Sequence, residues 1–144
     1  MVNPMAARMD AAVVEVTIDD ARLEAFVGDD AAGAVVTFRG VVRNHDDGRA
    51  VAGIRYVGHP SADAVMRRTV AEFQDRDGVH AVAAHHRVGD LAIGDTALVV
   101  VVGASHRKQA FACASDLVDR IKETLPIWKL QRFTDGSEEW SQCP

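Results

Sequence analysis

The sequence predicts an α+β fold in a single domain, with helices packed on a mixed or antiparallel sheet. Runs of apolar, β-branched residues alternate with segments in which apolar residues recur at helical spacing. Their order is strand, helix, strand, strand, helix, strand, strand, helix, strand, which is not the strict alternation of a parallel α/β sheet. The 144 residues suffice for one hydrophobic core, and no repeat or linker divides them.

The first part of the chain is expected to form a leader, a strand, a helix and a second strand. We expect residues 1–11 to be a flexible leader and residues 12–144 to form the domain. A strand over 12–18 comes first, and acidic residues then open a helix over 19–27, as the helix dipole prefers. The run GAVVTFRGVV at 33–42 is apolar on both faces, which is typical of a buried strand.

The middle of the chain predicts a hairpin followed by a helix. The loop signal HDDG at 45–48 precedes a strand over 51–57, so this strand and the preceding one resemble a hairpin with a long loop. Pro60 and Ser61 begin the next helix, with Ser61 as its N-cap. The buried stripe of this helix is expected to consist of Val65, Met66, Thr69, Val70 and Phe73.

The last part of the chain carries the most apolar strand and the longest helix. A strand over 79–87 leads into the glycine-punctuated turn GDLAIGD, and TALVVVVG at 96–103 predicts a central strand. Ser105 is expected to cap the long helix, which Pro126 ends before a final strand over 127–133. The apolar stripe of that helix is Ala110, Ala114, Leu117, Ile121 and Leu125.

Composition excludes several classes of protein. A net charge of −5 argues against general nucleic-acid binding, and no apolar run approaches the roughly 20 residues that span a bilayer. The N-terminus lacks the apolar stretch of a secretory signal, and Cys113 and Cys143 are too few for a disulfide framework. We therefore expect a cytoplasmic protein. No metal site is expected, because His85 and His86 are adjacent on a strand and point to opposite faces.

The cationic residues gather in three groups, Arg39/Arg43, His106/Arg107/Lys108 and Lys122/Lys129. Cations in the first turn of a helix oppose its dipole, so His106, Arg107 and Lys108 suggest an anion held together with free backbone N–H groups. The alternative is that these side chains simply point into solvent. An acidic protein that concentrates its cations in this way is a candidate for binding a small anion such as phosphate.

Lys122 and Lys129 flank the turn at Pro126, which could bring both amines into one pocket. Taken alone, Lys122 is also explained as a helix-terminal lysine that suits the dipole. Repulsion between two ammonium groups, with burial against Trp128, would favour a neutral amine that can act as acid, base or nucleophile. Arg107 and Lys122 are fifteen residues apart on one helix, about 22 Å along its axis. We therefore favour a site shared between two subunits of a symmetric dimer.

Four segments together resemble the large catalytic subunits of molybdopterin synthase. They are GAVVTFRGVVRNH (33–45), HRVGDLAIGD (86–95), VVVVGASHRKQAF (99–111) and DLVDRIKETLPIWK (116–129). Each is weak alone, but all four occur in the order and spacing of that family, and the resemblance covers residues 12–140. The chain departs from the family pattern at Gln131, where an acidic residue is common, and at Val57 and His59.

The resemblance implies an α/β hammerhead fold and a homodimer with a small ubiquitin-like sulfur-carrier subunit docked at each end, giving a heterotetramer. The C-terminal Gly-Gly thiocarboxylate of the carrier enters the active site, and sulfur is passed twice to cyclic pyranopterin monophosphate. The reaction opens the cyclic phosphate and leaves the dithiolene of molybdopterin. It implies no cofactor and no metal, since the sulfur arrives already activated.

Carried over by motif, the resemblance also implies roles for residues. Lys122 and Lys129 match the catalytic lysines. The residues that match the substrate-anion group, contributed across the dimer, are Arg43, His106 and Arg107. Those expected to shape the pocket and the entry channel of the carrier are Phe38, Gly40 and Trp128.

Two rival functions remain open at the level of sequence. One is a lysine-dependent lyase or aldolase on a phosphorylated metabolite, in which Lys122 forms a Schiff base. The other is an anion-sensing or carrier-docking module that binds without chemistry. Borohydride trapping would identify the first, and absence of turnover beside a competent carrier would identify the second.

Overall fold

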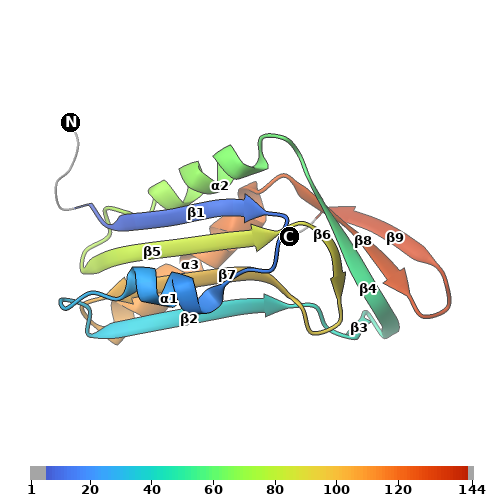
Figure 1. The fold of residues 1–144 in the computed structure, drawn as a ribbon, viewed down its shortest axis with the longest axis horizontal. Coiled ribbons are helices and arrows are strands. Elements are labelled where there is room, and N and C mark those ends of the chain that lie inside the picture. The colour runs from blue at the N-terminus through green and yellow to red at the C-terminus, as the bar shows by residue number, and fades with distance from the viewer. Residues whose placement is uncertain (1–5, 143–144) are drawn as a thin grey trace.

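The computed structural model describes residues 6–142, and Figure 1 shows its fold. A four-stranded mixed sheet in the order β1-β5-β7-β2 runs through the middle of the molecule. β1 is parallel to β5, whereas β5, β7 and β2 are mutually antiparallel neighbours. The strands of this sheet are β1 (Arg8–Val14), β5 (Val79–Arg87), β7 (Thr96–Ala104) and β2 (Ala34–Val41).

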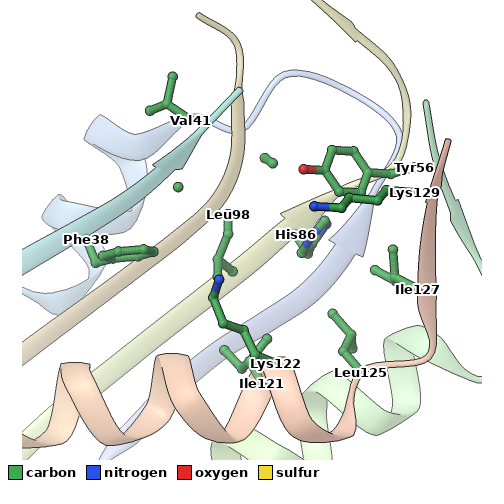
Figure 2. Close-up of a pocket in the computed structure, with 12 residues that line it drawn as sticks. Phe38, Val41, Tyr56, His86, Leu98, Ile121, Lys122, Leu125, Ile127 and Lys129 are labelled. Atoms are coloured by element: carbon green, nitrogen blue, oxygen red, sulfur yellow. The ribbon is translucent and has the colours of Figure 1, made fainter. Parts of the chain in front are cut away.

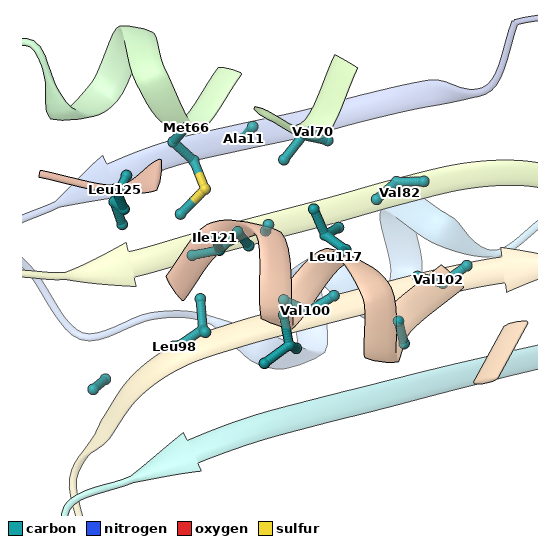
Figure 3. Packing of buried hydrophobic residues seen from close by; sticks show 14 of the residues in the cluster. Ala11, Met66, Val70, Val82, Leu98, Val100, Val102, Leu117, Ile121 and Leu125 are labelled. Atoms are coloured by element: carbon teal, nitrogen blue, oxygen red, sulfur yellow. The ribbon is translucent and has the colours of Figure 1, made fainter. Parts of the chain in front are cut away.

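Helices cover both faces of this sheet because the strands are apolar on both faces. In β7, Val100 and Val102 pack in the core cluster beneath two helices, while Val99 and Val101 pack in a second cluster beneath one. Figure 3 shows the first of these clusters, with Leu117 and Ile121 packed over the sheet. The helices are α2 (Ala62–Ala71) and α3 (Arg107–Thr124) on one face and α1 (Asp20–Val27) on the other.

A second sheet curls away from the first at one end of the molecule (Figure 1). Its long central strand is β4, which pairs with β8, β6 and the two-residue β3. The positive φ angles of Asp47 and Gly48, 49° and 75°, form the tight turn that joins β3 to β4. The strands are β3 (His45–Asp46), β4 (Arg49–Gly58), β6 (Gly89–Ala92), β8 (Ile127–Phe133) and β9 (Glu138–Gln142).

The expected α+β class, with a mixed sheet and packed helices, is confirmed. The strands expected at 79–87 and 127–133 have the observed bounds of β5 and β8. The expected stripe of the long helix is buried, and Cys113 and Val118 join it. The stripe expected on the second helix is also largely buried, because Met66, Thr69, Val70 and Phe73 are each less than a tenth exposed.

Two expectations about strands are wrong, and one strand was missed. The first strand begins at Arg8, so residues 8–11 belong to the sheet through their pairing with β5 and not to a leader; residues 1–5 lie outside the described residues. The strands at 33–42 and 51–57 are not a hairpin, because β2 pairs with β7 and β4 pairs with β8. The strand β9, which pairs with β8 after a turn at Gly136, was not anticipated.

Ser105 does not cap the long helix. The N-cap is His106, whose backbone N–H donates to Oε1 of Gln109 at 3.2 Å. The Ser105 hydroxyl instead lies 2.7 Å from Nε2 of His80 on β5. The hydroxyl of Ser105, which helix-capping rules assign to the N-cap, is therefore engaged by His80 instead.

Candidate active site

A pocket of about 160 Å³ lies where the two sheets meet, beside the C-terminal end of α3 (Figure 2). Its polar groups come from the side chains of Lys122, Lys129, His86 and Tyr56. Its walls are otherwise apolar, with residues of β2, β7, α3 and β8 around the cavity. The remaining lining residues are Phe38, Gly40, Val41, Ala97, Leu98, Ile121, Leu125 and Ile127.

The two lysines converge on this pocket as the sequence predicted. Lys122 lies in the last turn of α3, where a cation also suits the helix dipole. Leu125 ends the helix, and β8 begins at Ile127, so a short connection carries the chain to Lys129. Figure 2 shows both amines directed into the same space. Two positive charges at an apolar cavity make it a site for an anionic group.

Tyr56 and His86 also line the pocket, and sequence reasoning missed both. Tyr56 lies directly opposite Lys129 in the pairing of β4 with β8. Its ring meets the imidazole of His86 edge-on, with centroids 5.1 Å apart and planes at 73°. The sequence carried a partial signal for His86, because neighbouring strand residues face opposite sides and His85 and His86 had to diverge.

His86 is neutral and held in one tautomer. Its side chain is buried, with the residue 4% exposed. Nδ1 lies 2.8 Å from the carbonyl oxygen of Arg87, which can only accept, so Nδ1 carries the proton. Burial lowers the pKa of His86 from its ordinary 6.5 to about 4, and the charge of Lys122 acts in the same direction.

His85 faces the other side of the sheet, as expected, and takes no part in the pocket. Its Nε2 lies 2.7 Å from Oδ1 of Asp10 on β1. Cys113 is fully buried in α3, where burial raises the pKa of its thiol to about 11. Within residues 6–142 there is no cluster of three metal-binding side chains.

Arg43 lies on the lysine side of its own chain and not with His106 and Arg107. It donates to Oδ1 of Asp46 at 3.3 Å, and Gln131 donates to Oδ2 of the same carboxylate at 2.9 Å. Gln131 is buried two residues beyond Lys129 on β8. The hydrogen bond from Gln131, with the charges of Lys129 and Arg43, lowers the pKa of Asp46.

His106 and Arg107 stand at the opposite end of α3. They are exposed, and with Lys108 and Gln109 they border a shallow hollow at the start of the helix. The helix Arg107–Thr124 is continuous, so about 22 Å separates Arg107 from Lys122 along its axis. Within one chain the two cationic groups therefore lie far apart, as the length of the helix predicted.

Two of the three residues expected to shape the pocket do line it. Phe38 forms part of the wall, and Gly40 leaves room beside it, since an added Cβ would lie 3.5 Å from Leu98 and from the Phe38 ring. Trp128 does not line the pocket. It is 39% exposed and pairs with Val57, one position out of phase with Lys129 and Tyr56 along the two strands.

Comparison with known proteins identifies the family of this chain. A family model described as MoaE protein matches residues 13–124. The chain belongs to the MoaE family. The molybdopterin synthase catalytic subunit of Nostoc sp. is 37% identical over 120 residues, covering 82% of this chain and 73% of that protein. The subunit of the same name from Aspergillus fumigatus is 37% identical, and the match covers 78% of this chain but 60% of that protein.

Solved structures of MoaE-type proteins share the fold. The crystal structure of molybdopterin synthase from Staphylococcus aureus has a TM-score of 0.83 at 29% identity, covering 91% of this chain and 96% of that chain. A complex of subunits 1 and 2 of molybdopterin-converting factor from Helicobacter pylori has a TM-score of 0.70 at 20% identity, covering 92% and 89%. The family resemblance stated from four motifs, and the hammerhead fold that it implied, are therefore confirmed.

Proposed function

We propose that this MoaE-family chain is the catalytic subunit of a molybdopterin synthase. It transfers sulfur from a thiocarboxylated small carrier subunit to cyclic pyranopterin monophosphate, and forms the dithiolene of molybdopterin. The observation that carries the proposal is the convergence of Lys122 and Lys129 in one pocket whose remaining walls are largely apolar. Relatives at 37% identity bear the name of this catalytic subunit. The catalytic role of the two lysines is carried over from the motif resemblance.

The two lysines would act on the carrier end of the reaction. The ammonium of Lys122 polarises or protonates groups at the acyl–sulfur end of the carrier and at the substrate carbon under attack. Lys129, held on β8 opposite Tyr56, assists by its charge. Most of the remaining pocket wall is apolar, so the two lysines supply the positive charge of the pocket.

The phosphate end of the substrate would be held by cations outside the pocket lining. Arg43 supplies one from the same chain, where Asp46 and Gln131 keep it on the side of β8. His106 and Arg107 supply the others from a second subunit, because α3 is too long to bring them to the lysines of their own chain. The assignment of Arg43 to the lysine side replaces the expectation that all three residues come across the dimer.

A homodimer would bring the start of α3 in one subunit to the end of α3 in the other. Exposed apolar residues on the surface of the chain suit such a contact. Phe111 on α3 is 62% exposed, and Val35 on the edge strand β2 is 48% exposed. Phe111 borders an apolar hollow with Val36 and Phe38 that lies between the two cationic ends. A two-fold contact at this hollow would cover these residues and complete both sites symmetrically.

The carrier partner follows from the same proposal. A small ubiquitin-like subunit would dock beside the pocket and insert its C-terminal Gly-Gly thiocarboxylate, giving a heterotetramer with two carriers. The related Helicobacter pylori structure contains subunits 1 and 2 of molybdopterin-converting factor together. Among residues 6–142, no helix is long and apolar enough to cross a membrane. The cytoplasmic location stays a prediction from the sequence.

Reconstitution tests the proposal. The purified chain is mixed with a thiocarboxylated carrier subunit and cyclic pyranopterin monophosphate, and molybdopterin is detected as its fluorescent oxidised derivative. We expect product with the wild type and none with Lys122→Ala, which should retain the thermal stability of the parent. Glu123→Ala is the matched control, because Glu123 is the next residue on α3, is exposed and does not line the pocket.

Three outcomes would contradict this function or the role of Lys122 in it. Substantial turnover in Lys122→Ala would remove Lys122 from the mechanism. No product from the wild type, despite measured binding of the carrier, would favour a docking module. Borohydride trapping of a carbonyl substrate on Lys122 would instead identify the Schiff-base enzyme, because sulfur transfer requires no imine.

A further inference from the structure

The imidazole of His86 lines the pocket but has no role in the proposed sulfur transfer. The Nδ1–H of His86 is already donated to the Arg87 carbonyl, so the remaining nitrogen, Nε2, offers a lone pair. The His86 side chain is almost fully buried and lines the cavity, so Nε2 is the nitrogen left to meet a ligand there.

The two charged groups of the pocket, Lys122 and Lys129, complement this acceptor. The ammonium groups of Lys122 and Lys129 can only donate hydrogen bonds while they are charged. His86 stays neutral near pH 7, because burial lowers its pKa to about 4, so Nε2 can only accept. The pocket thus offers donors for an anion and, beside them, one acceptor for an N–H (Figure 2).

A peptide C-terminus carries both kinds of group close together. Its carboxylate, or thiocarboxylate, is an acceptor, and the last peptide N–H lies within the same residue. The narrow apolar walls and the missing side chain at Gly40 favour an end without side chains, such as Gly-Gly. Resting on the function proposed above, we propose that His86 is a specificity-determining residue whose Nε2 accepts the last peptide N–H of the carrier tail.

This proposal differs from a purely structural role for His86. A structural histidine would be satisfied by the Arg87 carbonyl and the edge contact with Tyr56, and its second nitrogen would add nothing to binding. If Nε2 accepts a hydrogen bond from the carrier tail, removing Nε2 weakens binding only for a peptide that has the last N–H. The difference can be measured on the ligand as well as on the protein.

The experiment is a double-mutant cycle in which one change is a substitution in the protein and the other is a chemical change in the peptide ligand. A short synthetic peptide ending in Gly-Gly carboxylate is compared with its ester analogue, in which oxygen replaces the last peptide N–H. Calorimetry measures both dissociation constants for the wild type and for His86→Phe, which keeps an aromatic ring but lacks Nε2. We expect the wild type to bind the amide peptide roughly three- to tenfold more tightly than the ester, the range of one hydrogen bond. His86→Phe should bind the two peptides equally.

His86→Gln serves as the conservative variant, since its side-chain oxygen can still accept a hydrogen bond in the cavity. It should recover part of the preference for the amide peptide. Thermal unfolding of each variant separates a loss of folded protein from a loss of recognition. The wild-type comparison alone remains informative if neither variant folds.

The outcomes separate this inference from the proposed function. Equal affinity of the wild type for both peptides, with binding that Lys122→Ala abolishes, would overturn the role of His86 and leave the function standing. The same amide preference in His86→Phe as in the wild type would also overturn it. If neither peptide binds the wild type, insertion of a Gly-Gly tail fails, and the role of His86 fails with it.

Discussion

Protonation of His86 should make the folded protein less stable in mild acid. The group is buried and neutral in the folded state, where its pKa is about 4, but it titrates near 6.5 when the chain unfolds. Its contribution is therefore present above pH 6.5 and is lost as the pH falls from 6.5 towards 4, because only the unfolded chain binds the proton in that interval. The difference between a pKa of about 4 in the folded chain and 6.5 in the unfolded chain corresponds to about 3 kcal/mol of free energy of unfolding. About 2 kcal/mol of this is lost between pH 7.5 and pH 5.

Urea unfolding at pH 7.5 and pH 5 measures this loss. The free energy of unfolding of the wild type should fall by about 2 kcal/mol more than that of His86→Gln, which cannot titrate in this range. The hydrogen-bonded carboxylates lose their contribution to the free energy of unfolding only at lower pH, and they are present in both proteins. His45→Gln is the control for removing an imidazole outside the pocket, because His45 is exposed on β3. Parallel pH dependences for the wild type and His86→Gln would refute the assignment of a neutral buried imidazole.

Three further predictions follow from packing and burial. Gly103→Ala should lower the free energy of unfolding by about 1–3 kcal/mol in urea, because its Cβ would lie 2.7 Å from Cγ1 of Val27; an unchanged value would contradict the close contact of α1 with β7. Gly40→Val should leave the melting temperature nearly unchanged but reduce turnover in the reconstituted assay by about tenfold or more, since the added methyl groups enter the pocket. The buried thiol of Cys113, with its pKa raised to about 11, should resist a thiol reagent at pH 8 in the native protein and react in urea; rapid native labelling would exclude that burial.

The parts of the fold that could be predicted are those that local pattern determines. β5 and β8 have the expected bounds because turn-forming residues flank each of them. Gly78 and Gly89 flank β5, while Pro126 precedes β8 and a turn at Gly136 follows it. The partners of β2 could not be predicted, since an apolar strand carries no record of which distant strand it will pair with. The hairpin expected for β2 and β4 failed for this reason, and β9 was missed because its charged residues conceal a strand that depends on pairing with β8.

The candidate site divides in the same way. The meeting of Lys122 and Lys129 could be predicted because only a short turn at Pro126 separates their elements. His86 and Tyr56 enter the pocket through the packing of one sheet against the other, which no local spacing reveals. Arg43 was grouped with the far end of α3, and the contact through Asp46 and Gln131 that moves it to the lysine side joins residues 85 positions apart.

The continuity of α3 has a genetic consequence in the proposed dimer. Each helix would serve two catalytic centres, with its first turn in one and its last turn in the other. Two inactive variants, Lys122→Ala and Arg107→Ala, would then complement each other when mixed, because a heterodimer contains one centre with both residues intact and one with neither. Random exchange of subunits should restore about a quarter of the wild-type centres. A harmful allele at one end of the helix could thus be rescued by a different harmful allele at the other.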